Sequence, residues 1–198
     1  WKVLRFRQWL LVRFIWRDLA NWSELAETMA DLSAMADVCI QQTLSLLYDW
    51  QVEINGIPRD DDGREQKMIV LGMGKLGAGE LNLSSDIDLI FTYPEEGETE
   101  GGRKPLSNSE FFVRLGRKLI QALDNQTVDG FVFRVDMRLR PFGESGALVS
   151  SFDAMEEYYQ TQGREWERYA MIKARAITGN DAGKKALSNN LTPIEKPS

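Results

Sequence analysis

Apolar residues at helical spacing mark two amphipathic segments at the start of the chain. Between Val3 and Ala20 apolar positions recur every three or four residues, with arginines among them. A second stretch places these apolar residues on one helical face: Leu25, Met29, Leu32, Cys39, Leu46 and Trp50. Asn21 and Glu24 have the spacing of a capping box that would open this second helix. We predict a helical part over residues 1–52, with Cys39 as a buried structural thiol.

Further along the chain the periodicity becomes that of strands. Residues 53–66 include the turn-rich stretch NGIPRDDDGREQ, which has no periodicity and predicts a linker. Met68–Leu71 and Ile87–Tyr93 are short apolar runs that predict strands of one sheet. The acidic stretch Pro94–Pro105 predicts a solvent-exposed loop.

The second half of the chain predicts an alternation of helix and strand. Ser107 and Glu110 have capping-box spacing and open an amphipathic helix. Alternating positions over residues 131–135 predict a third strand, and Ala147–Val149 predicts a fourth. Helical spacing returns over residues 151–177, with a break near the glycine at position 163.

These elements together predict a mixed α+β fold. Its core, residues 67–179, would contain a small mixed sheet flanked by helices on its N-terminal and C-terminal sides. Residues 180–198 are expected to form a C-terminal helix and tail.

The glycine run GMGKLG, Gly72–Gly77, matches the dinucleotide-binding fingerprint GxGxxG. A Rossmann crossover needs a helix of about ten residues before the next strand. Only residues 78–86 separate this run from the predicted strand at Ile87, so the spacing excludes that unit. A Walker A loop is excluded as well, because no Gly-Lys-Ser/Thr follows at the required offset.

Two acids follow the glycine run on a predicted strand. Asp86 and Asp88 are two residues apart, so their side chains leave the same face of the strand. Two carboxylates on one face repel each other unless a cation joins them, and Mg²⁺ prefers such oxygen ligands. A site for two metal ions, typical of phosphoryl or nucleotidyl transfer, needs a further carboxylate. Asp136, at the end of the third predicted strand, is the candidate.

Basic and glycine residues near these acids are candidates for phosphate binding. Arg138 and Arg140 would share the face of Asp136 if its strand continued, and guanidinium groups bind phosphate oxygens in pairs. Lys75 offers a positive charge, and the backbone around Gly74 offers N–H groups. Ser85 is expected either to contact nucleotide phosphate or to serve only in a turn.

The amino-acid composition excludes several kinds of catalytic group and partner. The chain of 198 residues contains no histidine, which excludes histidine bases, histidine metal ligands and a phosphohistidine intermediate. Its net charge of −6 argues against nonspecific nucleic-acid binding. One cysteine and no apparent secretory leader favour a cytoplasmic setting, and no apolar run approaches the ~20 residues that span a membrane. The first residue is Trp1 and not methionine, so we expect an excised part of a longer protein.

A glycine turn, Asp-x-Asp on a strand and a third aspartate resemble the polymerase-β-type nucleotidyltransferase superfamily. Two blocks, GMGKLGAGELNLSSDIDLIF (Gly72–Phe91) and RVDMRLRPFGESGALVSS (Arg134–Ser151), resemble the glutamine synthetase adenylyltransferase/adenylyl-removing enzyme family. The phrase DMRLRPFG and the run YYQTQGREWERYAMIKAR (Tyr158–Arg175) resemble the adenylyl-removing copy of that family's two domains. Ala78 departs from the glycine often found at its position.

The resemblance implies a polymerase-β-like core that removes AMP from a tyrosine of glutamine synthetase by phosphorolysis, giving ADP. Asp86, Asp88 and Asp136 would be the catalytic metal ligands for two Mg²⁺ or Mn²⁺ ions. Glutamine synthetase, phosphate, ADP or ATP, and the PII signal protein acting through the longer parent are the implied partners, and neither nucleic acid nor membrane is expected. The alternatives are the ATP-dependent adenylyltransferase half, a PII uridylyltransferase, a regulatory module without chemistry, and, for residues 1–52 alone, a helical interaction domain.

Overall fold

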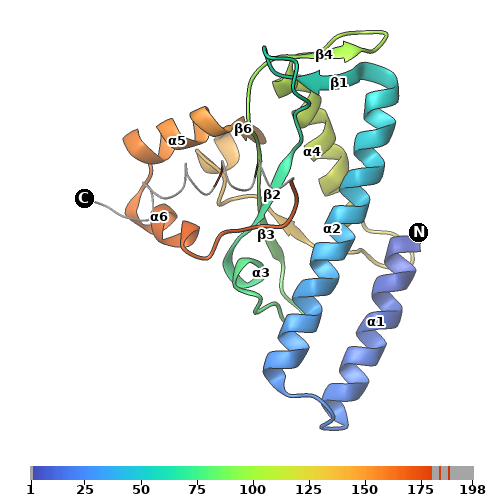
Figure 1. The fold of residues 1–198 in the computed structure, drawn as a ribbon. Coiled ribbons are helices and arrows are strands. Elements are labelled where there is room, and N and C mark those ends of the chain that lie inside the picture. Colours follow the sequence, from blue (N-terminus) through green and yellow to red (C-terminus); the bar gives the residue numbers. More distant parts are fainter. Residues whose placement is uncertain (1, 180–182, 184–186, 188–198) are drawn as a thin grey trace.

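The computed structural model describes residues 2–179, 183 and 187 of the chain. The helix and tail predicted over residues 180–198 lie almost entirely outside the described residues. The described part is a mixed α+β fold, as the sequence predicts, in which helices lie on both sides of a small sheet (Figure 1).

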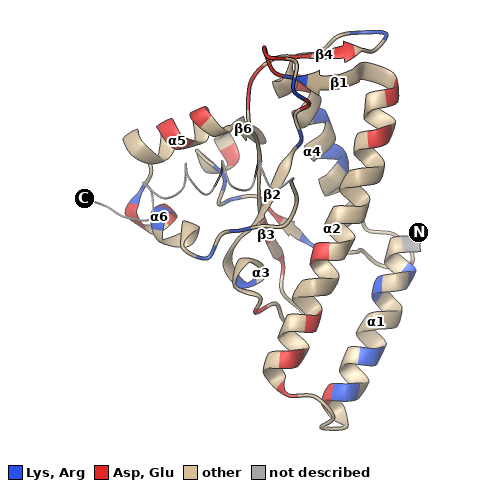
Figure 2. Cartoon of the chain, in the orientation of Figure 1, with Lys and Arg blue, Asp and Glu red and all other residues tan. Residues whose placement is uncertain are grey.

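Two long helices form the N-terminal part. Helix α1 (Lys2–Leu19) and helix α2 (Leu25–Asn55) lie side by side and meet at a turn far from the sheet (Figure 1). Helix α1 carries several basic residues, and α2 carries several acidic residues (Figure 2). Arg17 pairs with Glu27 and with Asp31, the latter at 2.7 Å, and so holds the end of α1 to the start of α2.

The capping box predicted at the start of α2 is wrong. The N-cap residue is Glu24, whose side chain makes no capping hydrogen bond. Asn21 lies earlier in the turn with φ 54°, a left-handed conformation that asparagine tolerates better than most residues. It therefore reverses the chain between the helices and does not cap α2.

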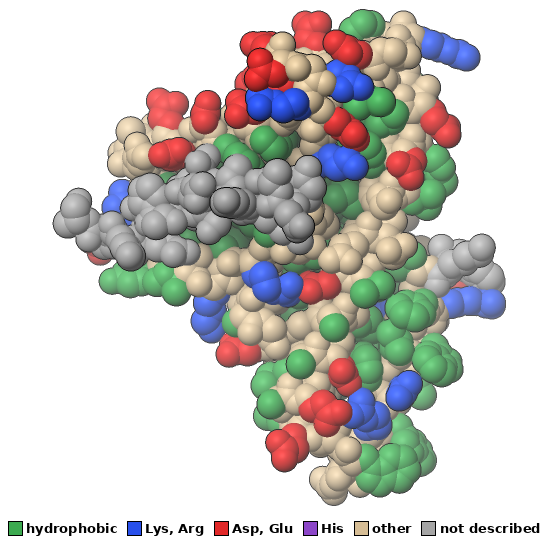
Figure 3. Space-filling view, viewed as in Figure 1, with side chains coloured by type: hydrophobic (Ala, Val, Ile, Leu, Met, Phe, Trp, Pro, Cys, Tyr) green, Lys and Arg blue, Asp and Glu red, His purple; other side chains and the backbone are tan. Residues whose placement is uncertain are grey.

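Helix α1 is apolar on two sides. Leu4 and Phe14 are buried in the core shared with α2. Trp9, Trp16 and Trp22, in contrast, are 63%, 65% and 70% exposed, and apolar atoms gather over this part of the surface (Figure 3). These tryptophans belong to the surface and not to the core.

The main sheet has five short strands. Their order is β5-β3-β2-β7, and β6 pairs with the same side of β3 as β5 does, further along that strand. β2 is antiparallel to both β3 and β7, whereas β5 and β6 are parallel to β3. The strands are β2 (Ile69–Gly72), β3 (Ile87–Tyr93), β5 (Val135–Asp136), β6 (Val149–Ser151) and β7 (Arg175–Ala176).

Both faces of this sheet are covered, which explains why β2 and β3 have continuous apolar runs. Val70 and Phe91 belong to a core cluster with α2 and α4 (Asn108–Asp124). Leu71 and Ile90 belong to a second cluster with α5 (Phe152–Thr161) and α6 (Glu165–Met171). The sheet therefore lies between two helical layers (Figure 1).

The predicted linker and acidic loop are wrong in part, because they contain two strands that pair with each other. β1 (Gly56–Arg59) and β4 (Glu98–Gly101) form an antiparallel ribbon. Residues 53–55 belong to α2, and Thr99 within the acidic stretch is buried. Neither segment has an apolar alternation, so this pairing between distant segments left no local signal.

The second half differs from the prediction in its strands. The predicted fourth strand, Ala147–Val149, is found as β6 at Val149–Ser151, and the helical stretch predicted over residues 151–177 ends at Met171 and is followed by β7. Ser107 caps α4 by accepting a hydrogen bond from the Glu110 amide, as predicted. The predicted third strand shrinks to β5, because the amides of Val132 and Phe133 donate to the carbonyl of Leu123 at the end of α4. Those amides therefore cannot form hydrogen bonds with a neighbouring strand. No helix within the described residues is long and apolar enough to cross a membrane.

Candidate active site

The predicted acids meet at the start of β3. Asp88 pairs with Asp136 in the parallel register of β3 and β5, and Asp86 precedes β3 by one residue. Ile87 and Leu89, which alternate with these acids, are fully buried. The expected placement of the carboxylates along one strand and its neighbour is thus confirmed, and we call Asp86, Asp88 and Asp136 the acidic row.

The three carboxylates have different electrostatic environments. Burial, and then the charges of Asp136 and Asp86, raise the pKa of Asp88. Hydrogen bonds from Arg138 lower the pKa of Asp136 despite its partial burial. Asp86 Oδ1 lies 2.5 Å from Nε of Arg134. The row is therefore crowded with negative charge at its centre and paired with cations at its two ends.

Arg134 is a site residue that the sequence reasoning missed. The register Ile87↔Val135 and Asp88↔Asp136, continued by one residue, sets Arg134 beside Asp86. Its position two residues before Asp136 was the available signal, because alternate residues of a strand share a face.

The donor atoms of the acidic row are of the kind that binds divalent cations. Carboxylate oxygens are the ligands that Mg²⁺ and Mn²⁺ prefer. In their present conformations, however, no group of three or more acidic side chains among the described residues is placed to hold one ion. Asp86 and Asp136 point to Arg134 and Arg138 instead. For all three carboxylates to hold one ion, Asp86 and Asp136 would have to turn away from these arginines.

The glycine turn lies directly against the row. The Met73 amide donates to the carbonyl of Asp88 at 2.9 Å, which ties the turn to β3. Gly74 has φ +51°, and a Cβ at this position would lie 2.9 Å from Asp88 Oδ2. Gly74 starts the short helix α3 (Gly74–Ala78), whose first amides have no partner within the helix. Because β2 and β3 are antiparallel, the exclusion of a Rossmann crossover is confirmed.

Lys75 and Ser85 lie beside the acidic row. Lys75 Nζ lies 3.5 Å from the Ser85 hydroxyl, which donates to Asn82 Oδ1 at 2.5 Å. Lys75 is exposed, and its charge lowers the pKa of Asp88. Two predicted phosphate-binding residues are thus brought together beside the acids.

The predicted strand face of Arg138 and Arg140 is wrong. β5 ends at Asp136, and the chain turns immediately afterwards. Arg138 turns back onto Asp136, with Nη2 2.5 Å from Oδ2. Arg140 donates to the carbonyls of Met137 at 2.8 Å and Glu144 at 3.1 Å, which holds the turn. Of these two arginines, Arg138 contacts the acidic row directly and Arg140 does not.

Arg175 anchors the glycine turn from behind. Its guanidinium pairs with Asp37 of α2 at 2.7 Å and donates to the carbonyls of Leu76 and Gly77. A Cβ at Gly77 would lie 1.9 Å from the Lys173 carbonyl, so only glycine allows this close approach. The position of the turn is therefore set by α2, by Arg175 at the start of β7 and by the segment just before it.

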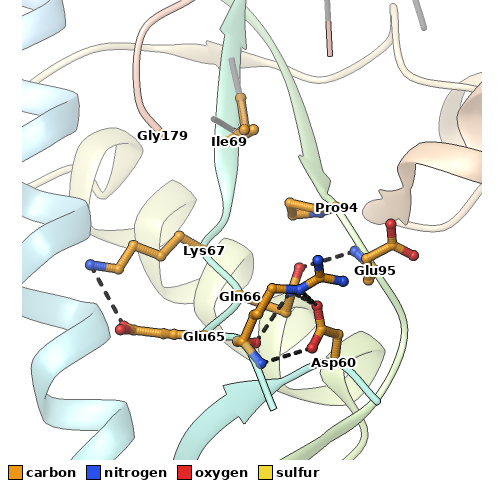
Figure 4. A pocket seen from close by; sticks show the side chains of 10 residues that line it. Asp60, Glu65, Gln66, Lys67, Ile69, Pro94, Glu95 and Gly179 are labelled. Atoms are coloured by element: carbon orange, nitrogen blue, oxygen red, sulfur yellow. Dashed lines mark hydrogen bonds and ion pairs between the residues drawn. The ribbon is translucent and has the colours of Figure 1, made fainter. Parts of the chain in front are cut away.

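A polar pocket of about 260 Å³ lies at the opposite end of β2 from the glycine turn, beside Ile69 and Pro94 (Figure 4). Its charged residues are engaged with one another. Arg64 pairs with Asp60 at 2.8 Å, and Gln66 donates to Asp60 at 3.1 Å and accepts from the Glu95 amide at 3.1 Å. These contacts tie the loop after β1 to the end of β3, and we assign the pocket no chemistry.

Comparison with known proteins decides the family. The family model described as glutamate-ammonia ligase adenylyltransferase matches residues 2–190. The chain belongs to this family. The match includes residues 2–52 as well as the sheet, so the helical part lies within the family region.

Individual members of the glutamate-ammonia ligase adenylyltransferase family are closely similar. A protein of Pseudomonas aeruginosa is 60% identical over 194 residues, which are 98% of this chain and 20% of the relative. One of Nitrosococcus oceani is 58% identical over 191 residues, 96% of this chain and 20% of the relative. Both are named bifunctional glutamine synthetase adenylyltransferase/adenylyl-removing enzyme. The chain thus spans about a fifth of the length of these curated relatives.

Proposed function

We propose that this chain is the adenylyl-removing nucleotidyltransferase domain of a bifunctional glutamine synthetase adenylyltransferase/adenylyl-removing enzyme. The observation that carries the proposal is the acidic row beside a glycine turn, in a chain of this family. Its substrate would be glutamine synthetase that carries AMP on a tyrosine. In the longer parent, PII would regulate the reaction.

The reaction is a phosphorolysis. An oxygen of inorganic phosphate attacks the phosphorus of the AMP–tyrosine ester, the bond from phosphorus to the tyrosine oxygen breaks, and ADP and free tyrosine result. Phosphate is already ionised near pH 7, so the absence of histidine is no obstacle. Catalysis then consists of positioning the reactants and neutralising their charge.

In this proposal some residues of the site would bind the metal ions, and others would bind the phosphate groups. Asp86, Asp88 and Asp136 would hold two divalent cations, which when bound would polarise the phosphoryl oxygens and stabilise the leaving tyrosine oxygen. Phosphate oxygens would be bound by these groups around the row: the amides at Gly74, and the side chains of Lys75, Ser85, Arg138 and Arg140. Of these side chains, Arg140 has to leave the carbonyls of Met137 and Glu144 before it reaches a phosphate.

The second candidate is the ATP-dependent adenylyltransferase half of the same enzyme. The names of the relatives include both activities, and both halves of the family share the acids. The phrase DMRLRPFG and the run from Tyr158 to Arg175 favour the removing half. The family match favours glutamine synthetase over PII as the protein substrate.

An assay in both directions separates the two halves. The chain is incubated with adenylylated glutamine synthetase, Mg²⁺ and phosphate, or with unmodified glutamine synthetase, Mg²⁺ and ATP. We expect ADP in the first mixture, dependent on phosphate and absent with Asp86→Asn, and no adenylylation in the second. Adenylylation of the unmodified synthetase would instead assign the chain to the transferring half.

A further inference from the structure

Arg134 is clamped to the turn that carries Asp86. Its Nε lies 2.5 Å from Asp86 Oδ1, and its Nη2 donates to the Ser84 carbonyl at 2.9 Å. The Arg134 carbonyl accepts from the Ile87 amide at 2.9 Å, so its backbone continues the pairing of β5 with β3. The guanidinium therefore occupies one of the two carboxylate oxygens of Asp86.

Arg138 engages the other end of the row more completely. Its Nε lies 3.1 Å from Oδ1 and 2.9 Å from Oδ2 of Asp136, and its backbone amide donates to Oδ1 at 2.8 Å. With Nη2 2.5 Å from Oδ2, both carboxylate oxygens are engaged. Arg138 would therefore compete with a metal ion for the oxygens of Asp136.

The carboxylate of Asp88, in the middle of the acidic row, has a different environment from those of Asp86 and Asp136. Among the described residues its carboxylate makes no hydrogen bond or ion pair, although it is partly buried. Among the described residues, the same row thus contains two carboxylates that are paired with guanidinium groups and one that has no such partner. Both arginine side chains are largely exposed, 56% for Arg134 and 74% for Arg138, so both are free to move without disturbing the core.

We infer that Arg134 and Arg138 are exchangeable counter-ions of the acidic row. They neutralise Asp86 and Asp136 when no cation is bound, and they transfer to phosphate oxygens of the substrate when divalent cations take the carboxylates. A guanidinium group binds phosphate with the same two-point geometry that it uses for a carboxylate. Arg134 thereby becomes a further substrate-positioning residue. This inference rests on the proposed function, because it requires the row to bind metal.

Because of this exchange, bound phosphate should increase the affinity for metal, and bound metal should increase the affinity for phosphate. A metal ion alone must displace the arginines without compensation, whereas phosphate offers the displaced guanidinium groups new partners. By linkage, phosphate then raises the affinity for metal by the same factor by which metal raises the affinity for phosphate. Removal of Arg134 should weaken this coupling.

The test is a Mn²⁺ titration of the whole chain, with and without phosphate. Without phosphate, Arg134→Gln should bind Mn²⁺ about twofold to fivefold more tightly than the wild-type chain, the range expected for a partly exposed ion pair. With phosphate, the variant should show a smaller gain in affinity than the wild-type chain. Arg117→Gln, which removes an exposed charge on α4, is the matched control and should leave both values unchanged.

A spectroscopic readout separates displacement from a general effect of charge. The Nε–Hε resonance of Arg134, assigned with Arg134→Lys, should shift when Mg²⁺ saturates the chain and shift again when phosphate is added. An unmoved resonance, or an unchanged or weaker Mn²⁺ affinity in Arg134→Gln, would overturn the inference. If Mn²⁺ affinity depends on Asp88 but not on Arg134, only this inference fails. If the wild-type chain binds no Mn²⁺, the proposed function fails with it.

Discussion

Asp88 lies directly opposite Asp136 in the parallel pairing of β3 and β5. The two residues are 48 positions apart in the sequence, and only the register of the strands brings them together. Each carboxylate alone would be an ordinary acid near a strand end. Burial raises the pKa of Asp88, and the juxtaposition with Asp136 and Asp86 adds a repulsion that raises it further and makes the position suitable for a cation.

The glycine turn supplies a prediction with an internal control. Gly74→Ala places a Cβ 2.9 Å from Asp88 Oδ2, at φ +51°, so we expect both a loss of stability of about 1–2 kcal/mol and at least a tenfold loss of turnover. Gly79→Ala has the same kind of strain at φ +74° but meets nothing within 4 Å. It should lose similar stability and keep its activity. Equal activity of the two variants would show that Gly74 does not position Asp88.

The anchor behind the turn gives a prediction about stability. Arg175→Met leaves Asp37 and the carbonyl of Gly77 without the guanidinium that they contact, so the free energy of unfolding should fall by about 1–3 kcal/mol. Lys173→Met removes only an exposed pair with Glu80 and should cost less than about 1 kcal/mol. Urea denaturation of both variants measures the difference. Equal losses would mean that Arg175 is no anchor.

Cys39 yields a prediction for the pH dependence of stability. Burial raises the pKa of its thiol from 9.0 to about 11. The folded state therefore favours the neutral thiol, and this contribution is complete below pH 9 and is lost as the pH rises towards 11. Relative to Cys39→Ala, the wild-type chain should lose stability across that interval in urea denaturation. A constant difference between the two proteins would contradict the burial of the thiol.

The same burial predicts low reactivity. At pH 8 the native chain should react with an aromatic disulfide reagent far more slowly than the chain in urea, because the reactive thiolate is disfavoured and enclosed. Rapid modification of the native chain would show that Cys39 is accessible.

The features that the sequence predicted correctly are those that a local pattern of residues encodes. The alternation around Ile87 and Leu89 was sufficient to place Asp86 and Asp88 on one side of β3, and the count of residues after Gly77 was sufficient to exclude a Rossmann unit. The β1–β4 ribbon was missed because its pairing joins distant segments without apolar alternation. The third strand was predicted too long, because the carbonyl of Leu123 takes amides that the pattern assigned to a ladder.

Charge pairing within the site was the least predictable feature. Arg138 was expected to face phosphate along a continuing strand, but the strand ends and the side chain returns to Asp136. Arg134 received no role from the sequence, although the register sets it beside Asp86. Such pairs depend on side-chain conformations that composition and periodicity do not encode.

The most direct test of this account is whether the acidic row binds divalent cations through its central carboxylate. Mn²⁺ binding to the wild-type chain and to Asp88→Asn can be followed by electron paramagnetic resonance, with Asp124→Asn, at the end of α4, as the control. We predict that Asp88→Asn loses at least tenfold in Mn²⁺ affinity while its free energy of unfolding stays within about 1 kcal/mol of the wild-type value. Equal Mn²⁺ affinity in the wild-type chain and Asp88→Asn would contradict the account.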